Sequence, residues 1–134
     1  IKFTSNNFME MIECIRFDGG RFDILNGFDE MLLCGMAVGA RGGVGSTYNY
    51  SLRTYQNIYD AFMAGDLEQA RAAQQESVDI VHVIINHGGG IRGGKASMKL
   101  VGIDCGDCRL PLAPYTEAEI ARLDEELRAI GFKK

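Results

Sequence analysis

Residues capable of covalent and hydrogen-bonding chemistry stand at the ends of three short runs in the sequence. These residues are Lys2, Thr4, Gly27, Asp29, Glu30 and Ser46. A lysine amine can attack a ketone to form an imine, which then serves as an electron sink. Carboxylates accept hydrogen bonds from the hydroxyls of a polyol. The set therefore indicates Schiff-base chemistry on a hydroxylated substrate.

Lys2 is the candidate for the covalent step. Amine attack requires a neutral nitrogen, so Schiff-base lysines in general need burial or neighbours that favour the neutral form. The end of a strand inside a barrel provides such burial. Thr4 stands two residues further on, and strand alternation sends its side chain to the same face as Lys2. Alone, either residue has an ordinary structural role, as a surface charge or as a β-branched strand residue.

The second and third runs supply the candidates for substrate binding. Asp29 and Glu30 suit the hydroxyls of a polyol, and Gly27 leaves its backbone open to the same molecule. Both carboxylates also suit the first turn of a helix, where negative charge is favourable. Ser46 can contact substrate or cap the following helix, although Asn49 is better placed for the cap. Both alternatives stay open at this point.

The elements that position these residues alternate between strand and helix. Residues 1–4, 22–25 and 43–46 are the expected strands, and helices begin after Asn6 or Asn7 and at Asp29. This alternation predicts parallel strands, whose carboxyl ends lie at one edge and carry the chemistry in βα barrels. The glycines at 42, 43 and 45 would weaken a strand. Their density suggests close backbone approach to a ligand.

After Asn49 the pattern predicts helices only. The expected ranges are 50–63, 66–86, 92–101 and 116–130. Asp66 begins a sequence of capping-box type, and Thr116 with Glu119 forms another. Gly131 ends the last helix. No repeat or low-complexity segment interrupts this order.

Composition excludes several functional classes. Acidic residues outnumber basic ones by 18 to 14, and the only basic concentration lies within 92–99, so we expect no nucleic-acid partner. No apolar run approaches the ~20 residues that a membrane span requires. At 46% hydrophobic residues the chain can form a core.

The cysteines give weak signals for metal or redox chemistry. Two lie on apolar faces of predicted helices, and two form a single Cys-x-x-Cys; in order they are Cys14, Cys34, Cys105 and Cys108. A zinc site would need two further ligands, and His82 and His87 belong to another predicted helix. We therefore predict no metal site and reduced cysteines, as is usual in the cytoplasm.

Three motifs give the chain a family resemblance. Lys2 at the end of its strand, Gly-Phe-Asp-Glu at 27–30 and Gly-Ser-Thr-Tyr-Asn at 45–49 resemble the pyruvate-dependent class I aldolases of the dihydrodipicolinate synthase/N-acetylneuraminate lyase superfamily. The residues of the second and third motifs most resemble those of the members that cleave sialic acid. The resemblance covers essentially the whole chain, but only the second half of the family's sequence.

The resemblance implies an α/β fold, the C-terminal half of a (β/α)8 TIM barrel followed by a helical extension. Residues 1–64 would form the last three βα units, and residues 65–134 the extension. A complete barrel takes about 250 residues, so we expect a fragment whose partner is the N-terminal half of the barrel. The family's carboxylate clamp and proton-relay tyrosine belong to that half, so the fragment alone would be inactive. The family also implies a homotetramer in the cytoplasm.

By resemblance, Lys2 forms a covalent imine with pyruvate and no metal or organic cofactor is needed. Thr4 would contact the substrate near the imine. Gly27, Asp29 and Glu30 match the positions that bind the hydroxylated tail of open-chain sialic acid, and Ser46 matches a hydroxyl contact on the last strand. The expected reaction is cleavage of N-acetylneuraminate to pyruvate and N-acetylmannosamine.

Two other functions stay open. One is another aldolase of the superfamily, such as dihydrodipicolinate synthase or a keto-deoxy sugar acid aldolase, which would share Lys2. The Asp29-Glu30 pair favours a polyhydroxylated substrate over a small semialdehyde. The other is a non-catalytic half-barrel subunit that acts through assembly, since a half barrel exposes a strand edge and an apolar interior.

Overall fold

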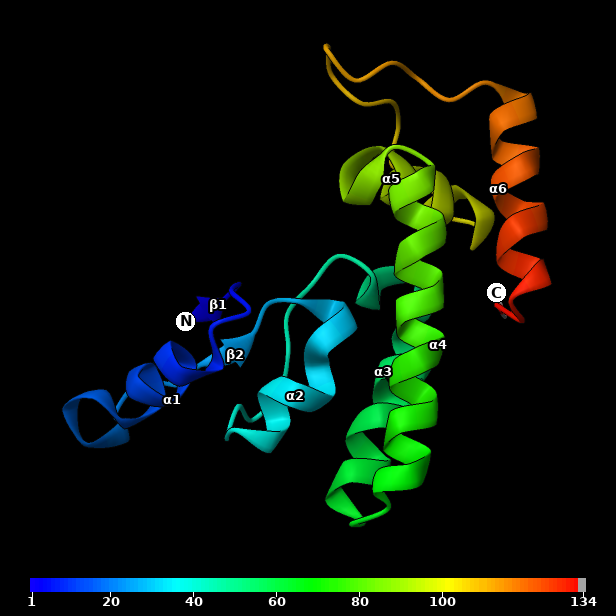
Figure 1. The fold of residues 1–134 in the computed structure, drawn as a ribbon. Coiled ribbons are helices and arrows are strands. Elements are labelled where there is room, and N and C mark those ends of the chain that lie inside the picture. Colours follow the sequence, from blue (N-terminus) through cyan, green and yellow to red (C-terminus); the bar gives the residue numbers. More distant parts are fainter. Residues whose placement is uncertain (133–134) are drawn as a thin grey trace.

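The computed structural model describes residues 1–132 and divides into a strand–helix part and a helical part (Figure 1). The last two residues of the predicted extension, 133–134, lie outside the described residues. The first part runs β1 (Lys2–Phe3), α1 (Phe8–Arg16), the 3₁₀ turn η1 (Phe17–Gly20), β2 (Leu25–Asn26), the 3₁₀ turn η2 (Asp29–Met31) and α2 (Leu32–Ala37). The second part runs α3 (Tyr48–Met63), α4 (Leu67–Asn86), α5 (Gly89–Leu100) and α6 (Glu117–Ala129).

The strands are short and parallel, as predicted. Lys2 pairs with Leu25 and Phe3 with Asn26, and Asn26 forms a parallel bridge with Gly43. The amide of Gly27 donates to the Phe3 carbonyl over 2.8 Å, and that of Val44 donates to the Asn26 carbonyl over 2.9 Å. The three predicted strands therefore stand side by side in chain order.

Two strand ranges differ from the prediction. The second strand lies at Leu25–Asn26 and not at 22–25, because Ile24 and Phe22 pack against Met11 of α1. Their apolar character reflects burial and not strand pairing. The third segment is a bridge at Gly43 and not a strand over 43–46, which fits the low strand propensity of glycine.

The predicted helix starts agree with the observed caps. The side chain of Asn7 accepts from the Glu10 amide over 3.3 Å, and that of Asp66 accepts from the Gln69 amide over 2.9 Å. Thr116 and Glu119 form the predicted capping box of α6. The helix expected at Asp29 starts as a 3₁₀ turn, and its α-helical part begins at Leu32.

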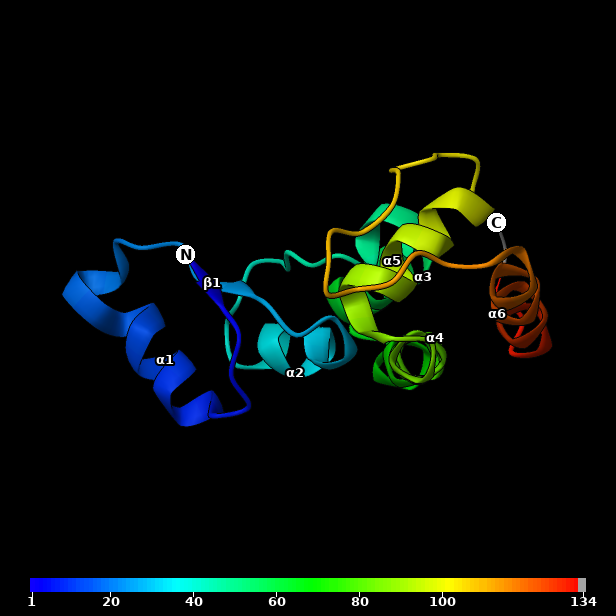
Figure 2. The same cartoon turned by 90° about the horizontal axis from the view of Figure 1, so that it is seen from above.

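Three clusters of buried side chains hold the elements together. One packs α1 against Ile24, which directly precedes β2, and a second joins α2 to α3 and α4 around Ile58. The third lies where α4 meets α5 and α6, around Ile80, Leu123 and Leu127. The long helices α3 and α4 run side by side, with β1 and α1 at one end of the molecule and α6 at the other (Figures 1 and 2). Within residues 1–132, no helix combines the length and apolarity that a membrane crossing requires.

Candidate functional site

The parallel register brings the candidate residues to one edge of the sheet. Lys2 and Thr4 lie in and after β1, and Gly27 follows β2. A Cβ placed on Gly27 would stand 2.9 Å from the Lys2 Cε and would also touch the Thr4 Oγ1. Lys2 and Thr4 are exposed, and Gly27 is buried between them. The lysine, the hydroxyl and the bare backbone of Gly27 therefore meet at one point.

Asp29 is a buried carboxylate with a defined set of donors. Asp29 is only 6% exposed. Its Oδ2 accepts from the Thr47 amide over 3.0 Å and also from the Thr47 hydroxyl. The Thr47 and Tyr55 hydroxyl oxygens lie 2.7 Å apart. Because the single Thr47 proton goes to the carboxylate, Tyr55 donates to Thr47, and a hydrogen-bond chain runs from Tyr55 through Thr47 to Asp29.

The glycines before Ser46 accommodate side chains of the protein itself. A Cβ on Gly45 would collide with the Asp29 carboxylate, and one on Gly43 would collide with the Tyr48 hydroxyl. Both contacts fall in the segment between the Gly43 bridge and Thr47. The glycines at 43 and 45, whose density predicted close approach to a ligand, therefore make room for Tyr48 and Asp29.

One buried oxygen in this group, the Asp29 Oδ1 that lies over Gly45, has no hydrogen-bond partner among the described residues. Most buried polar atoms in proteins are hydrogen-bonded, so such atoms mark places where water or a ligand group fits.

Burial and the negative charge of Asp29 act on the nearby tyrosines. Burial is the largest cause that raises the pKa of Tyr48, Tyr50 and Tyr55, and the Asp29 carboxylate raises each further. All three hydroxyls therefore stay protonated at neutral pH.

Glu30 and Ser46 are the sequence neighbours of Asp29 and Thr47, and both are more accessible than those two residues. Glu30 is half-buried in η2, and its charge contributes to the raised pKa of Tyr48. Ser46 is exposed, and its hydroxyl lies 3.6 Å from the Cβ position of Gly90 at the start of α5. The capping alternative for Ser46 and Asn49 is wrong, because Thr47 is the N-cap residue of α3.

Sequence reasoning did not assign a role to Thr47 or Tyr55. Thr47 stands inside the quoted Gly-Ser-Thr-Tyr-Asn motif, and Tyr55 lies eight residues further on, in α3. The only sequence signal was a threonine directly beside a candidate site residue.

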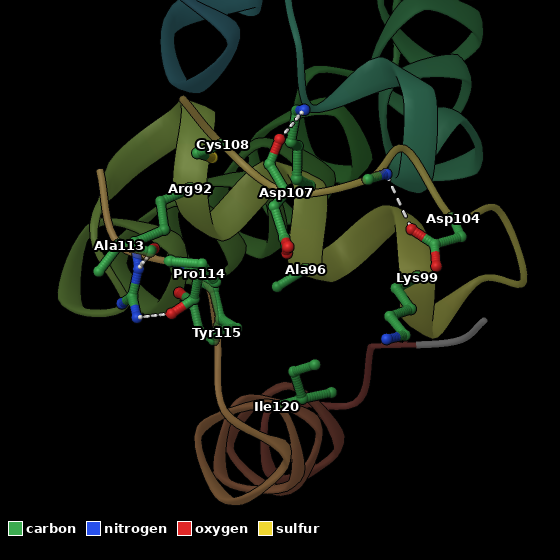
Figure 3. Close-up of a pocket in the computed structure, with 12 residues that line it drawn as sticks. Arg92, Ala96, Lys99, Asp104, Asp107, Cys108, Ala113, Pro114, Tyr115 and Ile120 are labelled. Atoms are coloured by element: carbon green, nitrogen blue, oxygen red, sulfur yellow. Dashed lines mark hydrogen bonds between the residues drawn. The ribbon is translucent and has the colours of Figure 1, made fainter. Parts of the chain in front are cut away.

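Away from this site, a pocket of about 240 Å³ lies between α5, the segment 103–115 and α6 (Figure 3). Of the three cations that line it, Arg92 and Lys95 bind main-chain carbonyl oxygens. Lys95 donates to the Cys105 and Asp107 carbonyls over 3.1 and 2.8 Å. Arg92 donates to the Ala113 carbonyl over 2.8 Å and stacks over the Tyr115 ring. These contacts hold the segment between the helices.

The Cys-x-x-Cys motif lies along this pocket. Cys105 is exposed and Cys108 half-buried, and both thiols are free. Across residues 1–132, no group of three or more histidine, cysteine, aspartate or glutamate side chains is arranged to hold a metal ion.

Comparisons with known proteins place the sequence within one group of enzymes. The model of the dihydrodipicolinate synthetase family matches residues 1–130. The N-acetylneuraminate lyase of Mus musculus is 35% identical over 134 residues, which are 98% of this chain and 42% of that protein. The lyase of Gallus gallus is 36% identical over 132 residues and is covered to 43%.

Solved structures agree with the sequence relatives. The chain superposes on the N-acetylneuraminate lyase of Proteus mirabilis with a TM-score of 0.91 at 36% identity, covering 98% of this chain and 44% of that one. The lyase of Aliivibrio salmonicida gives the same TM-score at 37% identity, with 99% and 44% covered. The chain therefore spans less than half the length of the relatives that it matches.

Proposed function

We propose, on the premise that the chain belongs to the dihydrodipicolinate synthetase family, that it is part of a Schiff-base (class I) aldolase. The proposed reaction is the reversible cleavage of N-acetylneuraminate to pyruvate and N-acetylmannosamine. The observation that carries the proposal is the contact of Gly27 with both Lys2 and Thr4, which leaves a lysine amine and a hydroxyl side by side at the end of a strand.

The fold supports a place in a barrel. We propose that residues 1–64 are the last three βα units of a (β/α)8 barrel and that residues 65–134 are a helical extension. The parallel order of β1, β2 and the Gly43 bridge supports this division. The partner would be the part of the barrel that the relatives carry and this chain does not span, in a cytoplasmic homotetramer of the complete enzyme.

Lys2 performs the covalent step in this proposal. Its neutral amine attacks the C2 carbonyl of the open-chain sugar acid, water leaves, and a protonated imine forms. The C3–C4 bond then breaks, its electron pair moves toward the imine to give an enamine, and the C4 hydroxyl loses its proton to become the aldehyde of N-acetylmannosamine. Protonation of the enamine at C3 and hydrolysis of the imine release pyruvate and free Lys2.

The remaining residues hold the substrate. Thr4 lies beside Lys2 and would donate to the substrate near the imine. Glu30 and Ser46 stand at the accessible side of the edge and would bind hydroxyls of the sugar tail. The family resemblance also assigns Asp29 to this tail; in the structure its Oδ2 accepts from Thr47 and its Oδ1 is buried over Gly45. The base that takes the C4 proton would come from the part of the barrel outside this chain.

Borohydride trapping tests the proposal. The experiment uses the complete enzyme, in which the chain is joined to the part of the barrel that its relatives carry. Borohydride added with pyruvate should fix a covalent adduct on Lys2, located by peptide mass mapping, and leave Lys95 and Lys99 unmodified. An unmodified Lys2 peptide, or full activity in Lys2→Ala, would show that the proposal is wrong.

Substrate choice needs a second assay, because every aldolase of the family would share Lys2. Cleavage of N-acetylneuraminate is compared with condensation of pyruvate and aspartate semialdehyde. We expect turnover in the first assay. Turnover only in the second would replace the lyase by a dihydrodipicolinate synthase.

A further inference from the structure

We infer that Thr47 and Tyr55 are positioning residues that set the separation of Glu30 and Ser46, two of the proposed contacts for the sugar tail. The inference rests on the proposed function. It names a determinant of substrate specificity among side chains that do not themselves reach the substrate.

The hydrogen-bond chain connects two different segments of the edge. Asp29 lies in η2, directly after β2, and Thr47 follows the glycine segment that pairs with β2. The Thr47 amide and hydroxyl both bind the same carboxylate oxygen, across 18 residues of sequence. This contact therefore fixes the turn after the third strand against the turn after the second.

The proposed substrate contacts are the immediate neighbours of the two linked residues. Glu30 follows Asp29, and Ser46 precedes Thr47. A displacement of Thr47 relative to Asp29 therefore moves Ser46 relative to Glu30 by a similar distance. A hydroxylated tail bound by both residues is sensitive to that distance, since hydrogen bonds weaken steeply away from their preferred geometry.

Tyr55 anchors the contact from the body of α3. Tyr55 is 3% exposed, and its ring packs edge-on against the ring of Tyr48, with the ring centroids 4.2 Å apart. Its hydroxyl fills the acceptor site of the Thr47 hydroxyl, so the Thr47 proton stays directed at Asp29. All three linked residues are at least nine-tenths buried, so water does not compete strongly for these bonds.

Close packing over Gly45 restricts this arrangement further. A Cβ at position 45 would overlap the Asp29 carboxylate. The carboxylate is thus confined between Gly45 on one side and the Thr47 donors on the other. The buried charge cannot move to another position without loss of its partners.

The test uses substitutions that remove a single hydroxyl in the complete enzyme. Tyr55→Phe keeps the ring, and Thr47→Val keeps the shape of the side chain. We expect kcat/KM for N-acetylneuraminate to fall about threefold to tenfold in Tyr55→Phe and about tenfold to a hundredfold in Thr47→Val, which loses a bond to a charged group. The rate of pyruvate trapping at Lys2 should not change in either variant.

Two further variants control the experiment. Thr47→Ser restores the hydroxyl and should recover most of the sugar-acid activity. Tyr59→Phe removes a hydroxyl one turn further along α3, at a residue that is 40% exposed, and should leave both readouts unchanged. Normal sugar-acid kinetics in Tyr55→Phe and Thr47→Val would overturn the inference, as would an equal loss of pyruvate trapping, which indicates a merely structural role.

Failure of the proposed function gives a different result. If the unsubstituted enzyme forms no adduct at Lys2, both the function and this positioning role are wrong. The link itself is then judged by a double-mutant cycle of Asp29→Asn and Thr47→Val on the free energy of unfolding. We expect the two effects to be coupled. Additive effects would show that the two residues are not linked.

Discussion

The backbone of Gly27 lies so close to Lys2 that a single methyl group at position 27 would stand 2.9 Å from the lysine Cε. It would also come within 2.8 Å of the Phe3 carbonyl oxygen, which belongs to the neighbouring strand and cannot swing away. The absence of a side chain at residue 27 is therefore a condition for the observed position of the candidate nucleophile.

Gly27→Ala should slow imine formation by displacing Lys2 and Thr4. We expect at least a tenfold lower rate of pyruvate trapping in the complete enzyme, because small misplacements of reacting groups carry large costs in rate. Gly42→Ala is the matched control, since a Cβ there meets only Leu25 at 3.9 Å. Equal trapping rates in the two variants would contradict the argument.

Glu30→Gln should impair sugar-acid cleavage and spare pyruvate chemistry. A hydrogen bond to a charged group is worth about 1.5–3 kcal/mol, so kcat/KM for N-acetylneuraminate should fall about tenfold to a hundredfold. The variant should still form the trapped adduct at Lys2. Unchanged cleavage would leave Glu30 as a helix-start residue without a role in binding.

Asp29→Asn should lower stability as well as activity, because Asp29 is buried and bound by Thr47. We expect a tenfold to hundredfold loss in kcat/KM, about that of Glu30→Gln, together with a lower melting temperature that Glu30→Gln does not show. Thermal unfolding of both variants, followed by circular dichroism, makes the comparison. Equal melting temperatures would mean that the Asp29 charge is dispensable for the fold.

The start of α6 should lose stability in acid. Hydrogen bonds lower the pKa of Glu119 from 4.5 to about 2. The bond from the Thr116 amide is the largest cause, and the bond from Arg92 is the next. A carboxyl whose pKa is lowered in the folded state stabilises the fold above its unfolded pKa and loses that effect as the pH falls toward its folded pKa. Glu119→Gln should therefore lower the melting temperature at pH 7, with a difference that shrinks between about pH 4.5 and 2. Glu117→Gln, in the same turn, is the control and should show no such trend.

The buried tyrosines should destabilise the fold in alkali. Burial raises the pKa of Tyr55 above its ordinary value of 10.0, so the unfolded chain releases this proton at lower pH than the folded one. The stabilising effect is complete below about pH 10 and declines above it. Tyrosinate absorbance of the folded enzyme should be the same in Tyr55→Phe as in the parent, and the difference should emerge only at unfolding. A smaller absorbance change before unfolding would show that Tyr55 titrates in the folded state.

Local signals in the sequence were sufficient for the outline of the fold. Asn7, Asp66 and Thr116 start helices as predicted, because a cap depends on residues within one turn of it. The alternation of elements correctly indicated parallel strands, and these bring Lys2 and Gly27 to one edge.

Contacts between distant segments could not be predicted in the same way. The bond between Thr47 and Asp29 and the close approach of Gly45 to the same carboxylate depend on how η2 meets the segment that precedes α3. The apolar residues before Leu25 predict a strand that the structure does not contain, because burial under a helix and burial in a sheet give the same short apolar pattern.

The connection between α5 and α6 has a consequence for how this chain can diverge. Arg92 and Lys95 lie three residues apart on α5 and bind main-chain carbonyl oxygens of the connecting segment. Every amino acid supplies such an oxygen, so Cys105, Asp107 and Ala113 can mutate without loss of these bonds. Substitutions should therefore accumulate in the connection faster than at the arginine and lysine that hold it.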